Sequence, residues 1–114
     1  MHLLTTLISL SFAYGMTSAS LVGDATFFNP ALGACGQVNG DNDLIVALSL
    51  DQFGTGSNCG RSIVANFQGA SVVATVVDKC VGCASSDIDL SPAAFSQLAS
   101  TDLGRIHGVS WDFI

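Results

Sequence analysis

Short apolar runs, separated by clusters of glycine, asparagine and aspartate, follow one another along most of this chain. Residues 44–48 form a continuous apolar run, which predicts a strand buried on both faces. Residues 109–113 alternate between apolar and polar side chains, which predicts a half-buried last strand. The same patterns predict strands at 25–28 and around Ile88 and Leu90, and a hairpin of 63–67 with 71–77 around Gln68-Gly69-Ala70.

Two serines mark the starts of short helices. Ser49 is followed three residues later by Gln52, which is the capping-box pattern. Ser91 is followed by Pro92, an N-cap with proline at the first helical position. We therefore expect one short helix after each serine.

The region around each serine occurs twice. The pattern L-S-x-x-x-F spans 48–53 and 90–95, 42 residues apart, and Gly60-Arg61 recurs as Gly104-Arg105, 44 residues later. Two matches in the same order predict a fold of two pseudo-twofold halves, each with a strand, a capped helix, a Gly-Arg turn and a strand. A small closed β-barrel fits this repeat, because closure removes exposed strand edges.

The first residues have the composition of a targeting segment. Residues 3–16 are apolar and uncharged, and small residues follow; the run is too short to span a bilayer. We expect a secretory signal peptide over 1–19, cleaved after Ala19, although it has His2 in place of a lysine or arginine. The alternative is a buried N-terminal helix. Export would leave one domain over 20–114, extracellular or associated with the cell wall.

Charge narrows the choice of partners. The 114 residues carry nine acids, all of them aspartate, against three basic residues, which gives a net charge of −6. Such a chain cannot neutralise a nucleic-acid backbone or an anionic lipid surface. We therefore expect neither nucleic acid nor a membrane as partner. We also expect a monomer, which the charge does not decide.

Four cysteines would meet an oxidising compartment after export. Cys35, Cys59, Cys80 and Cys83 allow three connectivities, of which we favour Cys35 with Cys59 and Cys80 with Cys83. Only one CxxC pair is present, so a zinc site is a weak alternative. Gly82 inside that motif favours a tight turn over a thioredoxin-type redox site. We expect no metal and no cofactor.

A set of motifs runs through the rest of the chain: Gly33-Ala34-Cys35-Gly36, Cys59-Gly60, Val76-Val77-Asp78-Lys79-Cys80-Val81-Gly82-Cys83, Asp89-Leu90-Ser91-Pro92-Ala93-Ala94-Phe95, Gly104-Arg105-Ile106 and Trp111. Together they resemble the double-psi β-barrel superfamily, which includes rare lipoprotein A-like proteins, expansins, barwin-type proteins and a small endoglucanase family. The likeness covers residues 23–113 and is greatest to the short secreted fungal proteins of the rare lipoprotein A-like group. It implies a mainly β, six-stranded double-psi β-barrel with two short helices, stapled by disulfides, and it implies the Cys35–Cys59 bridge.

The resemblance also implies a role for Asp89. This residue matches the aspartate of the D-L-S motif that acts as general acid in the endoglucanase relatives and is required in expansins. Glycoside hydrolysis normally needs a second carboxylate, which the hydrolytic relatives supply at the place where this chain has Asn29-Pro30. We therefore lean against an enzyme, while Asp24 nearby keeps a hydrolase open. The structural alternative is that Asp89 accepts backbone N–H bonds in the turn before the second helix.

Two further aspartates have both a functional and a structural interpretation. Asp78 lines the same groove in the family, but it is also placed to stabilise a turn. Asp87 would share a face with Asp89 if both lie in one strand, although a solvated surface acid is the more common case.

The remaining candidates are aromatic or basic. Phe28 would flank the groove and offer an apolar or sugar-stacking face, and His107 would be structural or line the groove. Arg61 and Arg105 are expected to donate hydrogen bonds to loop carbonyls. Trp111 is expected in the core.

Three functions fit these residues. The leading hypothesis is a secreted, expansin-like protein that binds cell-wall polysaccharide without hydrolysis, through a groove with Asp89, Asp78 and Phe28. The second is a protein-binding module, such as a cysteine-protease inhibitor or a secreted effector, which needs protruding apolar residues around Leu32 or Val81. The third and weakest is an oxidoreductase of the riboflavin-aldehyde-forming type, for which the sequence has no nucleotide-binding motif and no redox-metal ligand set.

Overall fold

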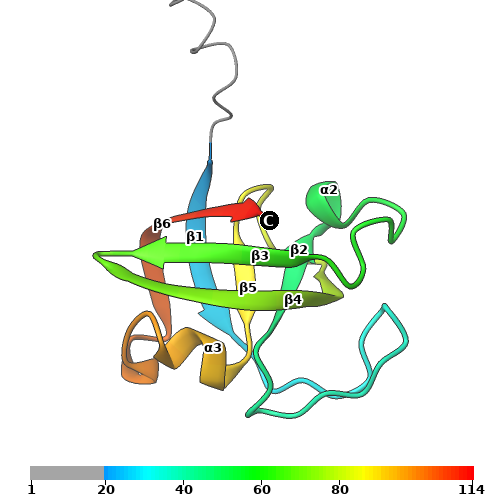
Figure 1. Ribbon diagram of the computed structural model, residues 1–114, viewed down its shortest axis with the longest axis horizontal. Coiled ribbons are helices and arrows are strands. Elements are labelled where there is room, and N and C mark those ends of the chain that lie inside the picture. The colour runs from blue at the N-terminus through cyan, green and yellow to red at the C-terminus, as the bar shows by residue number, and fades with distance from the viewer. Residues whose placement is uncertain (1–19) are drawn as a thin grey trace, which may run out of the picture.

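The computed structural model describes residues 20–114; the predicted signal peptide lies outside them. Six strands close into a barrel in the order β1-β5-β2-β4-β3-β6 (Figure 1). This confirms the mainly β, six-stranded double-psi barrel that the resemblance implied. The strands are β1 (Leu21–Phe27), β2 (Ile45–Ser49), β3 (Ser62–Phe67), β4 (Ala70–Cys80), β5 (Ile88–Leu90) and β6 (Arg105–Phe113).

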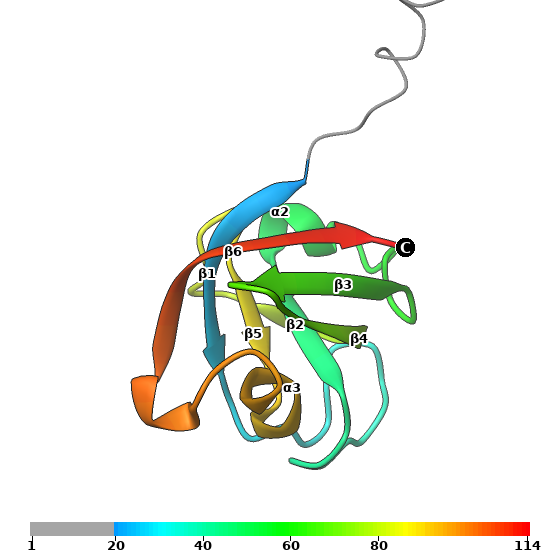
Figure 2. The same cartoon turned by 60° about the vertical axis from the view of Figure 1, so that its left-hand side comes forward.

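Both predicted helices are present. They are α2 (Leu50–Phe53) and α3 (Pro92–Ser96), and they lie at opposite ends of the barrel (Figures 1 and 2). Each begins at the predicted serine, whose side chain accepts a hydrogen bond from a backbone N–H of the first turn. A 3-10 helix, η1 (Thr101–Leu103), which the sequence did not predict, precedes β6.

The strand pairing has the predicted twofold symmetry. β1 with β5 and β2 with β4 are the parallel pairs, and the other four pairings are antiparallel. Exchanging β1 with β4, β2 with β5 and β3 with β6 leaves every one of these pairings unchanged. The sequence repeat therefore corresponds to two equivalent halves, which interleave to make one barrel.

The repeated serines perform the same task in each half. Ser49 and Ser91 are buried. Besides capping its helix, the Ser49 hydroxyl donates to the Ser85 carbonyl at 2.7 Å, and the Ser91 hydroxyl donates to the Asp43 carbonyl at 2.5 Å. Each serine thus ties its helix to a loop that is distant in sequence.

A single hydrophobic cluster fills the barrel. Trp111, predicted in the core, is fully buried, and its indole N–H donates to the Ser86 carbonyl at 2.9 Å. Phe53 and Phe95, the repeated phenylalanines, both belong to the cluster. The rest of the cluster is aliphatic and comes from all six strands, from α3 and from the turn that follows α3: Ala25, Val46, Leu48, Ile63, Ala65, Val72, Ala74, Val76, Ile88, Leu90, Ala94, Leu98, Ile106 and Val109.

Several strand limits differ from the prediction. β1 begins at Leu21 and β6 at Arg105, each earlier than predicted. The two strands remain paired there, although apolar and polar side chains no longer alternate cleanly in these segments. The β3–β4 turn consists of Gln68 and Gly69, at φ 48° and 87°, as expected for a two-residue hairpin turn. Ala70 therefore pairs with Phe67 and is not part of the turn.

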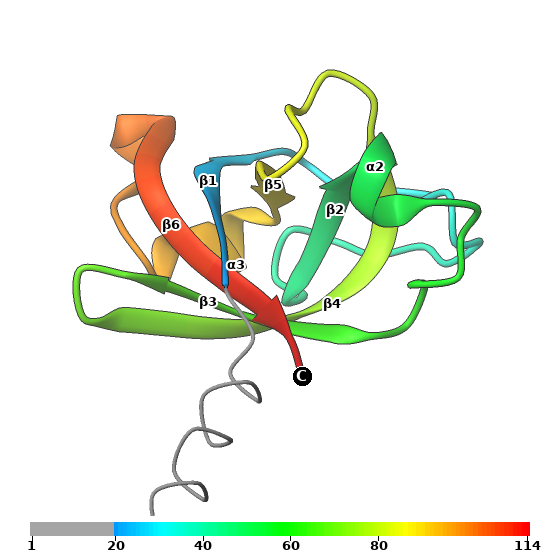
Figure 3. The same cartoon turned by 90° about the horizontal axis from the view of Figure 1, so that it is seen from above.

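Both predicted disulfides are present, Cys35–Cys59 and Cys80–Cys83. The first joins residues 24 positions apart and stabilises the fold by about 3 kcal/mol through the entropy of the unfolded chain. It connects the 29–43 loop, which reaches away from the barrel (Figure 3), to the segment just before β3. Two disulfides fit an extracellular, oxidising compartment. None of the helices within 20–114 has the length and apolar character needed to cross a membrane.

Candidate functional site

One row of laterally paired residues crosses five strands on the outside of the barrel. Arg105 pairs with Thr26, Thr26 with Asp89, Asp89 with Ala47, and Ala47 with Asp78. Laterally paired residues point to the same face of a sheet, and strands lie about 4.8 Å apart, so these five positions span about 19 Å. We call them the polar row.

The row faces outwards because its neighbours along the chain face inwards. Ile88 and Leu90, on either side of Asp89, both belong to the core, and side chains alternate along a strand. Asp89, Thr26 and Asp78 are half-buried and Arg105 is exposed. No pocket is found among residues 20–114.

Asp89 occupies the middle of the row. The Thr26 hydroxyl donates to Asp89 Oδ1 at 2.9 Å. Partial burial raises the pKa of Asp89 above its ordinary value, and the Thr26 hydrogen bond and the charge of Arg105 oppose this rise in pKa only in part. The structural alternative for Asp89 is wrong: the backbone N–H of the second helix is capped by Ser91, which leaves the carboxylate directed to the outer surface.

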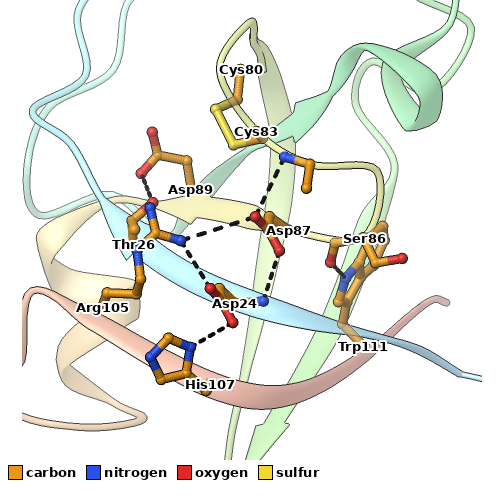
Figure 4. A network of polar contacts seen from close by, with 11 residues as sticks. Asp24, Thr26, Cys80, Cys83, Ser86, Asp87, Asp89, Arg105, His107 and Trp111 are labelled. Carbon is orange, nitrogen blue, oxygen red and sulfur yellow. Dashed lines mark hydrogen bonds and ion pairs between the residues drawn. A yellow bond between two sulfur atoms is a disulfide. The ribbon is translucent and has the colours of Figure 1, made fainter.

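Asp24 connects two basic side chains of β6 beside the row (Figure 4). Its Oδ2 accepts from Arg105 Nη1 at 3.0 Å, and its Oδ1 lies 2.8 Å from His107 Nδ1. The hydrogen bond from His107, with that from Arg105, lowers the pKa of Asp24. Asp24 is therefore an ionised partner that fixes the position of Arg105.

Asp87 braces the turn that precedes β5. Its Oδ1 accepts from the Asp24 backbone N–H at 2.9 Å, and its Oδ2 lies 4.0 Å from Arg105 Nη1. The turn packs so closely on β1 that a Cβ on Gly23 would lie 2.2 Å from the Ser86 carbonyl oxygen. Asp87 is thus not the freely solvated acid that its sequence context favoured; it joins β1 to this turn and faces Arg105.

Asp78 ends the row at the 29–43 loop. Its Oδ1 accepts from the backbone N–H of Ala34 at 2.8 Å and of Lys79 at 2.9 Å. The turn-stabilising interpretation is therefore confirmed, and the register places the same residue in the row with Asp89.

Three further aromatic and basic candidates, Phe28, His107 and Arg61, are not members of the row. Phe28, half-buried, follows the end of β1, where its N–H donates to the Leu90 carbonyl at 2.9 Å. The side chain of His107 is 76% exposed and reaches the row only through Asp24. Arg61 donates to the Asn58 side chain and lies over the Phe113 ring.

The expectation that both arginines bond loop carbonyls is wrong. Arg105 pairs with carboxylates, because β6 begins at this residue and carries it beside β1. Thr26 and Arg105 are the row members that sequence reasoning missed. A sequence signal for both residues was available. Thr26 lies two residues from Asp24, and Arg105 lies two residues from His107, and residues spaced by two share one face of a strand.

Within residues 20–114, no group of three or more histidine, cysteine or acidic side chains is arranged to hold a metal ion. The side chains of the row itself offer four kinds of polar group. These are one half-buried carboxylate with a raised pKa, one hydroxyl, one carboxylate bound to backbone amides, and a guanidinium with further N–H groups.

Comparison with known proteins agrees with this architecture. A family model described as lytic transglycolase matches residues 20–110. Allergen Asp f 7 of Aspergillus fumigatus is 39% identical over 98 residues, which cover 81% of this chain and 36% of that protein. The chain spans less than two fifths of the first three curated relatives.

Solved structures of two further proteins have the same fold. The papain inhibitor of Streptomyces has a TM-score of 0.79 and 30% identity, covering 87% of this chain and 97% of that protein. The ligand-free expansin of Clavibacter michiganensis has a TM-score of 0.75 and 25% identity, covering 83% of this chain and 50% of that protein.

Proposed function

Because this chain belongs to the double-psi β-barrel family described as lytic transglycolase, we propose that it is an expansin-like protein that binds cell-wall polysaccharide without hydrolysing it. The observation that carries the proposal is the polar row, in which four of the five strands supply a hydrogen-bonding side chain and the fifth supplies the buried Ala47. A protein exported to the cell wall would meet polysaccharide first.

The groups of the row suit the hydroxyl groups of a sugar chain. Asp89 Oδ2 has no side-chain partner among residues 20–114, and it is free to accept from a sugar hydroxyl, while Thr26 fixes Oδ1. Arg105 uses Nη1 for Asp24, and a guanidinium has further N–H donors to offer. Trp111, the one tryptophan, is buried, so stacking on sugar rings falls to Phe28.

The neighbouring carboxylates support binding over hydrolysis. A hydrolase needs a base or nucleophile as well as an acid. Asp24 is held by Arg105 and His107, and Asp78 is held by two backbone N–H groups. Asp89 is therefore the one carboxylate of the row without a competing ionic or backbone partner.

A sedimentation assay tests the proposal. The oxidised protein would be mixed with insoluble chitin, β-glucan, cellulose and peptidoglycan, beside Asp89→Asn and the control Asp102→Asn, whose exposed side chain lies in η1. We expect retention on one polymer, weakened in Asp89→Asn and unchanged in Asp102→Asn. Retention that is equal in both variants would remove Asp89 from the site.

The supernatants of the same assay test for bond cleavage. Soluble fragments, released by the parent protein and absent with Asp89→Asn, would show that Asp89 acts as a catalytic acid and would overturn the non-hydrolytic part. Equal, background levels of fragments in every sample are the expected result.

A second candidate function is inhibition of a cysteine protease. It is favoured by the 29–43 loop, which the polysaccharide-binding proposal does not use. Leu32 and Val38 face each other across an isolated antiparallel bridge and are 69% and 76% exposed. The loop is held by the Cys35–Cys59 disulfide and by Asp78, and a pre-organised loop loses little entropy on binding. The likeness to the Streptomyces papain inhibitor supports a papain-type partner.

Inhibition of papain tests this candidate separately. Leu32→Asp with Val38→Asp should abolish inhibition, whereas Leu103→Asp, at an exposed leucine of η1, should leave it intact. Absence of inhibition by the parent protein would eliminate the candidate and leave the polysaccharide proposal untouched.

A further inference from the structure

We propose that Asn39-Gly40 is a site of self-modification, in which the Asn39 side chain loses its amide through a cyclic imide formed with the Gly40 nitrogen, with Asp43 assisting. The pair lies near the end of the 29–43 loop, and it is the one Asn-Gly dipeptide in the sequence. The inference concerns a reaction of the chain itself and is independent of polysaccharide binding.

The loop brings both reacting nitrogens to one carboxylate oxygen. Asp43 Oδ2 accepts from the Gly40 backbone N–H at 2.9 Å and from Asn39 Nδ2 at 3.2 Å. The first nitrogen is the nucleophile of imide formation and the second is the leaving group. One acceptor that touches both is positioned to take a proton from the nucleophile and deliver it to the leaving group.

The remaining contacts hold the loop in this arrangement. The Asn39 backbone N–H donates to the Ala31 carbonyl at 3.0 Å, and the Asp43 N–H donates to the Gly40 carbonyl at 3.1 Å. Asn39 Oδ1 is buried and accepts no hydrogen bond from any residue within 20–114. The negative charge that develops on this oxygen during attack therefore meets no donor from these residues, so any acceleration in the folded loop must come from Asp43.

The reaction balances with water as its only co-reactant. The Gly40 nitrogen bonds to Asn39 Cγ, the Cγ–Nδ2 bond breaks, and ammonia leaves with the proton that the Gly40 nitrogen gives up. Water then opens the imide at either carbonyl, which yields aspartate or isoaspartate at position 39. No oxidation or reduction occurs.

The product would change the loop. A carboxylate at position 39 would face Asp43 and repel it, in place of the present amide-to-carboxylate hydrogen bond. The isoaspartate form also lengthens the backbone beside the Leu32–Val38 bridge. Modified molecules should therefore present the two exposed aliphatic side chains in a less ordered loop.

Peptide mapping by mass spectrometry during storage at neutral pH tests the proposal. We expect the Asn39 peptide to gain one mass unit and an isoaspartate signal, while the peptide with Asn66, an exposed strand residue of the same chain, stays unchanged. Equal modification of both peptides, or of neither, would overturn it.

Two variants separate the contributions. Asp43→Asn keeps a hydrogen-bond acceptor but cannot take up a proton, and should slow the reaction about tenfold, a modest share of what a positioned acid–base group provides. Gly40→Ala fits the backbone, since its Cβ would meet no atom within 4 Å, and should block attack by crowding the nitrogen.

The unfolded chain gives the last comparison. If Asn39 reacts as fast in urea as in the folded protein, or if Asp43→Asn reacts at the parent rate, the assignment of Asp43 is wrong. A folded rate above the unfolded rate, lost in Asp43→Asn, confirms it.

Discussion

Ser49 and Ser91 occupy equivalent places in the two halves of the barrel and make equivalent contacts. The residue two positions before each serine differs: it is Ala47 in the first half and Asp89 in the second, and these two residues pair with each other across β2 and β5. The polar row therefore crosses the centre of the pseudo-symmetric barrel, where one half supplies a methyl group and the other a carboxylate.

The repeated arginines also differ between the two halves, since one belongs to the scaffold and the other to the row. Arg61 lies 4.3 Å from the centre of the Phe113 ring and belongs to the scaffold, whereas Arg105 pairs with Asp24 and belongs to the row. Repeated elements build the barrel, and residues that differ between the two halves supply the polar groups of the row. Four predictions test this comparison, from the largest effect to the smallest.

The repeated phenylalanines should both be structural, with unequal weight. Phe95 is fully buried and its ring centre lies 5.1 Å from that of Phe27, while Phe53 is 7% exposed. Phe95→Ala should lower the free energy of unfolding by about 4 kcal/mol and Phe53→Ala by about 3 kcal/mol. Urea denaturation measures both; a larger loss for Phe53→Ala would contradict the packing described here.

The repeated serines should be nearly interchangeable in energy. Ser49→Ala and Ser91→Ala each remove a helix cap and a hydrogen bond to a distant loop, and each should cost about 1–2 kcal/mol. The same denaturation experiment reports the difference between them. If one variant were neutral and the other strongly destabilised, the two halves would not share a scaffold.

The repeated arginines should separate stability from binding. Arg61→Ala should cost about 0.5–1 kcal/mol from the lost contact with Phe113 and leave polysaccharide binding unchanged. Arg105→Ala should weaken binding about fivefold, the equivalent of one hydrogen bond. Depletion isotherms on the retained polymer measure this; equal binding by the two variants would place Arg105 in the scaffold.

The smallest effect is a pair of opposite pH dependences. Burial raises the pKa of Asp89, so the folded protein loses stability as the pH rises through the folded-state pKa and Asp89 ionises. Relative to the parent protein, Asp89→Asn should therefore become more stable towards neutral pH. His107 and Arg105 lower the pKa of Asp24, so its contribution is present above the unfolded-state pKa and lost as the pH falls. Asp24→Asn should therefore lose stability at neutral pH, and this loss should fade in acid.

Thermal unfolding at several pH values follows both variants. Parallel curves for Asp89→Asn and Asp24→Asn would contradict the difference in environment between the two carboxylates.

Sequence patterns predicted the helices and strands of the barrel well, because the signals for each element lie within a few residues of it. Ser49 and Ser91 mark the starts of their helices within one turn of the chain. The alternation around Ile88 and Leu90 predicts which of these residues are buried. Glycine and cysteine motifs in the resemblance supplied the topology, which no periodicity could give.

The site was harder to predict because it depends on lateral register. Thr26 meets Asp89 across 63 positions, and Arg105 meets Asp24 across 81. The bulge between Gly23 and Ala25 sets part of that register, and it lies where Gly23 leaves no room for a Cβ beside the Ser86 carbonyl.

A nuclear magnetic resonance titration tests the central claim most directly. Soluble oligomers of the polymer that retains the protein would be added to isotope-labelled protein while backbone amide shifts are followed. The account predicts changes along the polar row, at Thr26, Asp89 and Arg105, that are absent in Asp89→Asn. Changes confined to the Arg61 and Phe113 region, or to the Leu32–Val38 bridge, would show that the row is not the binding surface.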